Sequence, residues 1–261
     1  MGKSFPGKVI VVANQKGGVA KTTTTGALAA ILAKKHGFKV LCLDMDPQAN
    51  LTDNSGVEQN TAMDEVLLGE VKISDFIEKT PSYDILPSSI SLATMEQKLS
   101  GVMGREYKLK EAISSDSSLS KYDYILIDTP PSLNILTVVS LVAADEVIIP
   151  TMADLNASSG IYQLGNIISS VKQYFNPNLK ISGIVFTRFV PRFRISKQIR
   201  DIANLLADQL DTKVFSTYIR QSVNAPEATY MRKSLVDYNP TSKVAKDYEA
   251  LVSELLSDWK H

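Results

Sequence analysis

The sequence predicts an α/β fold, a single doubly wound, mostly parallel sheet with helices on both faces. Short apolar runs rich in Val, Ile and Leu alternate along the chain with longer segments of helical periodicity. This alternation is typical of right-handed strand–helix–strand units. A glycine turn followed by Lys-Thr also separates the first apolar run from the first helical segment. Composition does not change along the chain and no repeat is present, so we expect one domain over residues 1–261.

The first two predicted strands flank a helix. Lys8–Ala13 is an apolar run that precedes the glycine turn, and Ala27–Lys35 carries leucine and isoleucine among alanines at helical spacing. Gly37 is the kind of residue that ends such a helix. Lys39–Asp44 is short, apolar and rich in branched side chains, as expected of a strand buried on both faces.

The region between the second strand and residue 121 has a weaker pattern. The elements expected there are helices at Met63–Leu68 and Ser74–Glu78, a brief strand at Tyr83–Pro87, an apolar helical face made by Leu92, Met95, Leu99 and Met103, and a loop at Ser114–Ser120. We interpret the apolar face as core packing, because a stripe at helical spacing is typical of a helix that covers a core.

The second half of the chain returns to a clear alternation. The predicted strands are Tyr122–Asp128, Glu146–Pro150, Lys180–Thr187 and Val214–Ile219. The predicted helices are Leu133–Ala143, Ala157–Phe175, Ile195–Leu210 and Pro240–Trp259. Each helix is long enough to connect two parallel strands across one face of a sheet.

Composition excludes several classes of protein and of site. Lys plus Arg and Asp plus Glu both total 28, so contact with nucleic acid requires a local basic patch. The single cysteine, Cys42, excludes a disulfide framework, a cysteine-based zinc site and an iron–sulfur cluster within one chain. No apolar stretch approaches the ~20 residues of a membrane span. Because a signal-peptide pattern is also absent, we expect a cytoplasmic protein.

Gln15–Thr23 has the composition of a phosphate-binding loop. Gly17 and Gly18 allow the backbone to bend so that successive N–H groups point at one anion, and the following helix N-terminus adds partial positive charge. In such a loop Lys21 reaches the β- and γ-phosphates, and the Thr22 hydroxyl completes a Mg²⁺ shell. An ordinary glycine-rich turn with solvated lysines is the alternative, but the strand and helix on either side favour the phosphate loop.

Two further strands end in carboxylates. The strand Lys39–Asp44 continues into Asp46, and Tyr122–Asp128 ends in one aspartate followed by Thr-Pro-Pro. The carboxyl ends of parallel strands form the edge where open α/β sheets bind ligands. In phosphoryl-transfer sites, the acid that binds Mg²⁺ is typically an aspartate at the end of a strand. Each feature alone also fits a polar surface turn, whereas beside a phosphate loop they predict a metal site.

The loop resembles the deviant Walker A box, K-G-G-x-G-K-[ST]-T, of the ParA/MinD/nitrogenase iron-protein class of P-loop ATPases. Across nearly the whole chain, the sequence is similar to ParA/Soj-type DNA-partition ATPases of the short kind. The segments that carry the resemblance are Ala13–Thr24, Asp44–Asn50, Ile127–Pro131 and Pro150-Thr151. Ala20 stands where the family has glycine. We expect nucleotide binding to survive this change, because the loop's donors are backbone N–H groups, and hydrolysis to be slow.

The resemblance implies a function. In this family ATP drives formation of a homodimer with ATP sandwiched between the chains, the dimer binds DNA without sequence preference, and a ParB-like centromere-binding protein stimulates hydrolysis. We therefore expect a weak Mg-dependent ATPase that acts as a molecular switch in plasmid partition or chromosome segregation. It would be nucleoid-associated, with no membrane partner and no N-terminal DNA-reading domain ahead of the ATPase domain.

The resemblance also implies roles for individual residues. Lys16 resembles the signature lysine that crosses the dimer interface to the partner's phosphates, and Lys21 resembles the phosphate lysine. Asp46 resembles the carboxylate that positions the attacking water. The implied nucleotide-binding residues are Lys16, Gly17, Gly18, Val19, Ala20, Lys21, Thr22 and Thr23. The implied metal residues are Thr22, Asp44 and Asp128.

Basic residues gather in the last third of the chain. Between Lys180 and Lys233 there are ten Lys or Arg residues and four Asp or Glu residues. Such residues can contact phosphates without reading sequence, although a charge run is often only a solvated face. Arg192 and Arg220 fall where the family's DNA-contacting arginines lie. The predicted DNA-binding residues are Arg192, Arg194, Lys197 and Arg220.

Two alternatives share the phosphate loop. A membrane-associated positioning ATPase of the MinD kind requires a C-terminal amphipathic helix with a basic face, whereas the tail Val244–His261 carries four acidic residues against two lysines. A metabolic enzyme, such as an ATP-dependent amidotransferase or a carboxylating ligase, requires its own substrate chemistry. The sequence shows no arrangement of Cys or His nucleophiles for that role, with His36 and His261 as its two histidines.

Overall fold

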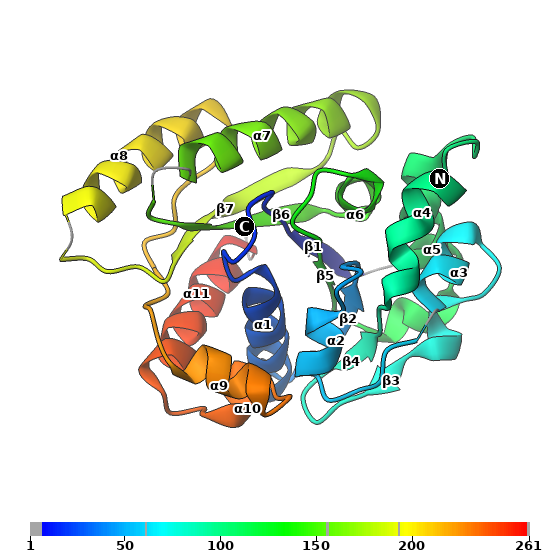
Figure 1. The fold of residues 1–261 in the computed structure, drawn as a ribbon, viewed down its shortest axis with the longest axis horizontal. Coiled ribbons are helices and arrows are strands. Elements are labelled where there is room, and N and C mark those ends of the chain that lie inside the picture. The colour runs from blue at the N-terminus through cyan, green and yellow to red at the C-terminus, as the bar shows by residue number, and fades with distance from the viewer. Residues whose placement is uncertain (1–6, 61, 155–156, 193, 260–261) are drawn as a thin grey trace.

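Seven strands form one sheet in the computed structural model, which describes residues 7–60, 62–154, 157–192 and 194–259 (Figure 1). The strands are β1 (Lys8–Val12), β2 (Val40–Asp44), β3 (Glu78–Lys79), β4 (Asp84–Leu86), β5 (Tyr124–Asp128), β6 (Glu146–Met152) and β7 (Lys180–Thr187). Their order is β3-β4-β2-β5-β1-β6-β7, and every pair is parallel except the antiparallel pair β3–β4. The predicted fold class is confirmed.

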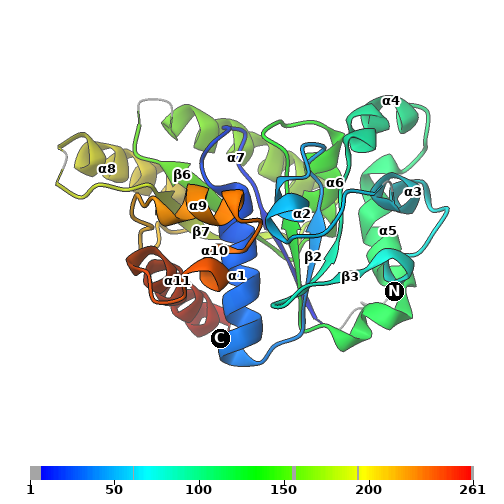
Figure 2. The same cartoon turned by 60° about the horizontal axis from the view of Figure 1, so that its bottom comes forward.

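Helices cover both faces of the sheet (Figures 1 and 2). They are α1 (Lys21–His36), α2 (Asn50–Asn54), α3 (Ala62–Leu68), α4 (Met95–Lys98), α5 (Lys108–Ser115), α6 (Ile135–Ala143), α7 (Ala157–Tyr174), α8 (Arg194–Gln209), α9 (Asn224–Tyr230), α10 (Leu235–Tyr238) and α11 (Lys243–Trp259). Helices α1, α10 and α11 contribute to the core on one face, and α3 to α8 contribute to the core on the other.

Successive side chains of the central strands alternate between two buried cores, because neighbouring residues of a strand point to opposite faces. In β1, Val9 and Val11 lie in the core beneath α3 to α8, whereas Ile10 lies in the core beneath α1 and α11. In β5, Ile127 lies in the core beneath α3 to α8, and Leu126 lies in the core beneath α1 and α11. Both faces are therefore buried, which explains why these strands read as continuous apolar runs.

Several predicted elements need correction. Val214–Ile219 is not a strand, since one isolated bridge, from Val214 to Ile184, pairs it with the sheet. The backbone N–H groups of Ser216 and Thr217 instead donate to the carboxylate of Glu254 at 3.0 and 3.1 Å. The predicted loop Ser114–Ser120 is mostly helical, at the end of α5 and in a short 3₁₀ turn. Of the predicted apolar face, Met103 is 97% exposed.

Helix α1 is longer than its sequence periodicity indicates. It begins at Lys21, six residues before the expected segment, because the polar threonines of its first turns belong to the site at the end of the sheet. Gly37 ends it in the left-handed conformation with φ 73° and donates its N–H to Ala33. The predicted stop is confirmed.

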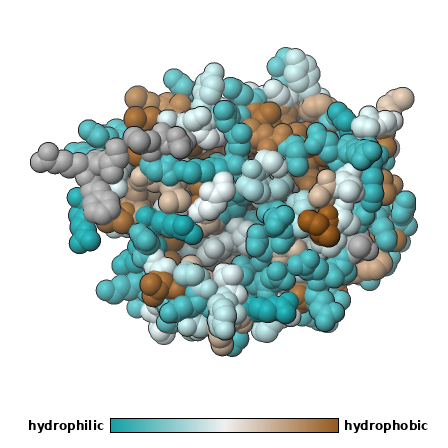
Figure 3. Space-filling view, in the orientation of Figure 1, coloured by the Kyte–Doolittle hydropathy of each residue, from teal (hydrophilic) through white to brown (hydrophobic). Residues whose placement is uncertain are grey.

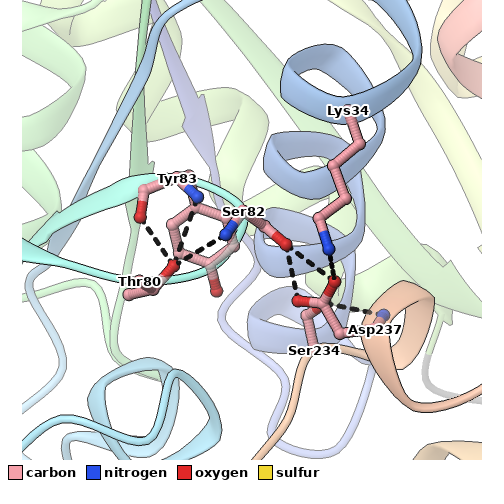
Figure 4. Close-up of polar contacts among 6 residues, drawn as sticks. All are labelled: Lys34, Thr80, Ser82, Tyr83, Ser234 and Asp237. Atoms are coloured by element: carbon pink, nitrogen blue, oxygen red, sulfur yellow. Dashed lines mark hydrogen bonds and ion pairs between the residues drawn. The ribbon is translucent and has the colours of Figure 1, made fainter.

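Asp237 connects three parts of the chain on the α1 face (Figure 4). Its carboxylate accepts hydrogen bonds from Ser82 at 2.6 and 2.7 Å and from Ser234 at 2.8 Å, and it pairs with Lys34 of α1. Burial alone would raise the pKa of Asp237, but the hydrogen bonds from Lys34, Ser82 and Ser234 hold that pKa below its usual value. The charged form therefore stabilises the folded state.

Most of the surface viewed in Figure 3 is hydrophilic, with apolar side chains scattered among polar ones. Within the described residues, no helix is both long and apolar enough to cross a membrane.

We predict that Asp237→Ala lowers the free energy of unfolding by about 2 kcal/mol, since it removes charge-assisted hydrogen bonds to three segments. Glu249→Ala is the matched control, because Glu249 forms one exposed ion pair with Lys35, and such pairs contribute about 1 kcal/mol or less. Urea unfolding measures both. Equal losses of unfolding free energy in the two variants would show that the contacts of Asp237 contribute no more than a surface ion pair.

Candidate functional site

The segment after β1 has the backbone shape of an anion-binding loop. Gly18 has φ 77°, a conformation open to glycine at no steric cost. Ala20 adopts the same left-handed region with φ 65° and ψ 33°, which costs a residue with a Cβ about 1–2 kcal/mol. The side chain of Val19 is fully buried, and its carbonyl accepts a hydrogen bond from Thr187 at 3.0 Å. The loop is thus anchored to the end of β7.

The first turn of α1 has backbone donors that the helix does not use. Ala20 precedes the helix without a side-chain cap, the first turn has no acidic residue, and the first helical bond runs from Thr24 N–H to the Ala20 carbonyl at 2.9 Å. Unpaired N–H groups and the helix dipole together favour an anion at this position. A phosphate chain is a ligand that such a site accommodates.

Strand register brings the two predicted metal carboxylates to one edge of the sheet. Asp44 and Asp128 are directly paired at the ends of β2 and β5. The hydroxyls of Thr22 and Thr25 donate to the Asp128 carboxylate at 2.7 and 3.2 Å. Hard oxygen ligands of this kind suit Mg²⁺, which keeps several waters and needs few protein carboxylates. The described residues contain no group of three or more acids, histidines or cysteines placed to hold a metal ion.

Burial raises the pKa values of both carboxyls at this edge. Burial, followed by the charge of Asp44, raises the pKa of Asp128 to about 8. Burial also raises the pKa of Asp44 to about 6. The pKa of Lys21 is lowered by burial, although Asp128 and Asp46 oppose that change. A divalent cation beside the carboxylates would offset their mutual repulsion, so the residues present fit the predicted metal.

Asp46 lies beside this cluster and is 5% exposed. Its N–H donates to Asp44 at 3.1 Å, and its Oδ1 accepts a hydrogen bond from the N–H of Gln48 at 3.0 Å. No described residue hydrogen-bonds to its Oδ2. One carboxylate oxygen is therefore held in place while the other is open to a further donor such as water.

Lys16 has a partner within its own chain. Its ammonium group forms an ion pair with Asp154, which follows β6, and its N–H donates to the Asn14 side chain at 3.0 Å. Asn14 in turn donates to the carbonyl of Pro150 at 2.7 Å. Lys16 thus lies at the loop, as predicted, but reaching a second chain would require it to exchange the Asp154 carboxylate for another anion.

The predicted DNA-binding residues lie on neighbouring segments beyond β7. A bridge between Phe189 and Arg220 places the two segments side by side, and both Arg192 and Lys197 are exposed. Arg220 forms two hydrogen bonds of 2.7 Å with Asp247 of α11, so its guanidinium already has an acidic partner. Arg194 begins α8, but its side chain lies outside the part of the chain that the structure describes.

Four residues that the sequence did not indicate also lie at the candidate site. Thr25, Thr52, Ser88 and Asp154 each contact a predicted site residue or its backbone. Only Thr25 has a sequence signal, since it lies one turn after Thr22 on the same helix face. The others are brought to the site by tertiary structure, and single Ser, Thr and Asp residues carry no spacing pattern that marks them.

We predict that Ala20→Gly raises the free energy of unfolding by about 1 kcal/mol in the absence of ligand, because glycine relieves the left-handed strain. Ala27→Gly, in the regular interior of α1, is the control and should lower it by about 1 kcal/mol. Urea denaturation measures both. The strain interpretation is wrong if the two variants destabilise equally. With nucleotide, we expect Ala20→Gly to preserve affinity and to raise the hydrolysis rate.

Comparisons with known proteins agree with this geometry. Residues 7–181 match the family model described as an AAA domain. The sporulation initiation inhibitor protein Soj of Bacillus subtilis is 36% identical over 97% of this chain and 99% of its own length. The chromosome partitioning protein ParA of Caulobacter vibrioides is 35% identical over 97% of this chain and 95% of its own length.

A solved structure gives the same result for the fold. Cobyrinic acid a,c-diamide synthase from Mycobacterium smegmatis, with a bound ATP analogue and magnesium, superimposes with a TM-score of 0.83 at 35% identity, covering 97% of this chain and 96% of that one. The full-length similarity to Soj and ParA, together with the phosphate loop and its paired aspartates, shows that this chain belongs to the ParA/Soj family of P-loop ATPases.

Proposed function

We propose that this protein is an ATP-dependent DNA-segregation ATPase that acts in plasmid or chromosome partition. ATP with Mg²⁺ would bind at the loop after β1, and a dimer with ATP between the chains would bind DNA non-specifically. A ParB-like partner would stimulate hydrolysis and release the DNA. The observation that carries the proposal is the convergence of the anion-binding loop, the Asp44–Asp128 pair and Lys16 at one edge of the sheet.

The site has the groups that phosphoryl transfer requires. Lys21 and the free N–H groups of the first turn of α1 would hold the β- and γ-phosphates, while Thr22 and Asp128 would hold Mg²⁺, with Asp44 supporting its shell. The metal would neutralise charge on the transferred phosphoryl group. Asp46 would orient the attacking water through its open Oδ2. Positioning and charge neutralisation supply most of catalysis in this class of reaction.

Lys16 would couple the site to dimer formation. In a single chain its ammonium group is paired with Asp154. A phosphate chain on the partner subunit carries more negative charge than one carboxylate, so it would compete for the lysine. Nucleotide would then favour the dimer because it binds that state better than the monomer. Two copies of the basic segments beyond β7 would also double the number of phosphate contacts.

The membrane alternative is less well supported. Helix α11 would have to present an apolar face to lipid. Tyr248, Leu251 and Leu255 of this helix are instead at most 1% exposed and pack in the core with α1. The surface that remains contains acidic residues such as Glu254, which binds the segment beyond β7.

A metabolic alternative follows from the name of the diamide synthase whose fold matches. Such chemistry on an amide donor requires a nucleophile that substrate can reach. Cys42 is fully buried in β2, which raises the pKa of its thiol well above the usual value, so it is inert in that role. The sequence similarity to Soj and ParA favours partition.

We predict that the purified protein binds duplex DNA tightly with ATP and Mg²⁺ and weakly with ADP or without nucleotide. Affinity should be independent of sequence and should fall steeply as salt rises, because phosphate contacts release counterions. Fluorescence anisotropy across a salt series measures all three states. Equal binding in all nucleotide states would contradict the proposal.

Arg192→Glu tests the proposed DNA-binding surface on the segments beyond β7. It should lower DNA affinity roughly ten-fold and reduce the salt slope by about 1 or more, while ATP binding stays unchanged. Lys110→Glu is the matched control, because Lys110 is exposed on α5, at the opposite end of the molecule from α8 (Figure 1). Equal losses in the two variants would mean that only net charge matters, and intact binding by Arg192→Glu would place the surface elsewhere.

A further inference from the structure

Two hydroxyl side chains that the sequence did not mark support the segment from Asp44 to Asp46. Ser88 lies just after β4, and Thr52 lies in α2. Both are fully buried. A buried hydroxyl needs hydrogen-bond partners, and both find those partners on the two aspartates or on each other.

The hydrogen bonds form one continuous chain. The Ser88 hydroxyl donates to the Asp46 carbonyl at 2.7 Å, and the Ser88 N–H donates to the Thr52 hydroxyl oxygen at 2.9 Å. The Thr52 hydroxyl then donates to Oδ2 of Asp44 at 2.7 Å, and the Thr52 N–H donates to the same oxygen at 2.9 Å. The end of β4 is thereby tied to both carboxylate-bearing residues.

These contacts leave Asp46 little freedom. Its N–H donates a hydrogen bond to Asp44, and its Oδ1 accepts one from the N–H of Gln48. Its carbonyl accepts hydrogen bonds from the Ser88 hydroxyl and from the N–H of Ala49, the latter at 2.8 Å. Ala49 itself has φ 51°, a left-handed conformation that persists only where surrounding contacts enforce it. The turn is therefore strained and externally supported, and the direction of the open Oδ2 depends on that support.

We propose that Ser88 is a positioning residue for hydrolysis, with Thr52 as the link between Ser88 and Asp44. The inference rests on the proposed role of Asp46 toward the attacking water. Ser88 holds the Asp46 carbonyl, and through it the turn that aims Oδ2, without touching the nucleotide. Displacement of a reacting group by about 1 Å can cost on the order of 100-fold in rate, so loss of one fixed contact at this turn affects turnover.

The phosphate loop does not depend on Ser88. Its anion donors are backbone N–H groups of the loop and of α1, and its anchors are Thr187 at Val19 and Asn14 at Lys16. Removal of the Ser88 hydroxyl should therefore lower the rate constant of hydrolysis and leave the affinity for ATP unchanged.

The test is single-turnover hydrolysis of bound ATP, which resolves slow rates, together with the dissociation constant for ATP. Ser88→Ala should lower the rate constant roughly 10- to 100-fold with an ATP dissociation constant within two-fold of the parent. Ser89→Ala is the matched control, because the Ser89 hydroxyl contacts Ser91 and not Asp46. That variant should keep the parent rate. An unchanged rate in Ser88→Ala, or equal losses in both variants, overturns the proposal.

Thr52 gives an independent pair of variants should Ser88→Ala fail to fold. Thr52→Ser keeps the hydroxyl and should keep most of the rate, whereas Thr52→Val keeps the shape and should lose it with ATP binding intact. Equal rates for the two variants overturn the proposed role of Thr52 as the link.

Asp46→Ala distinguishes failure of this inference from failure of the proposed role of Asp46. If it abolishes hydrolysis while Ser88→Ala and Thr52→Val do not, only this inference fails, whereas normal hydrolysis by Asp46→Ala overturns the role of Asp46 and the inference together.

Discussion

The buried carboxylate of Asp128 is the contact on which the rest of the site depends. It accepts hydrogen bonds from Thr22 and Thr25, so the end of the central strand β5 is fixed to the first turn of α1. The same strand pairs with β2 and sets Asp128 beside Asp44. One residue thus fixes the phosphate loop, the helix N-terminus and the second carboxylate relative to one another, and its burial is what makes a nearby cation favourable.

Repeated patterns were predictable from the sequence, and long-range single contacts were not. The central strands, most long helices and the loop residues Lys21 and Thr22 follow from periodicity and motif spacing. The segment 214–219 has strand composition, yet Glu254 takes hydrogen bonds that a neighbouring strand would have made. Short helices such as α9 and α10 carry too few residues to show a period. Ser88 reaches Asp46 across 42 positions of sequence, a contact that no local pattern encodes.

The site is built from one rigid side and one exchangeable side. Asp46 is held by buried contacts to Ser88 and Asp44 and by a part-buried contact to Gln48. Lys16 instead rests on Asp154 in a partly exposed ion pair, which is a weak and replaceable interaction. This difference fits the proposed switch, in which Asp46 would stay in place in each chain and Lys16 would leave Asp154 only for a more highly charged anion.

The most direct test of this account is the molecular mass of the protein in solution with and without ATP and Mg²⁺, for the parent and for Lys16→Ala. Light scattering under conditions that prevent hydrolysis measures it. We expect the parent to be a monomer without nucleotide and a dimer with ATP, and Lys16→Ala to be a monomer that still binds ATP. A parent whose mass does not change with ATP, or a Lys16→Ala variant that dimerises normally, would contradict it.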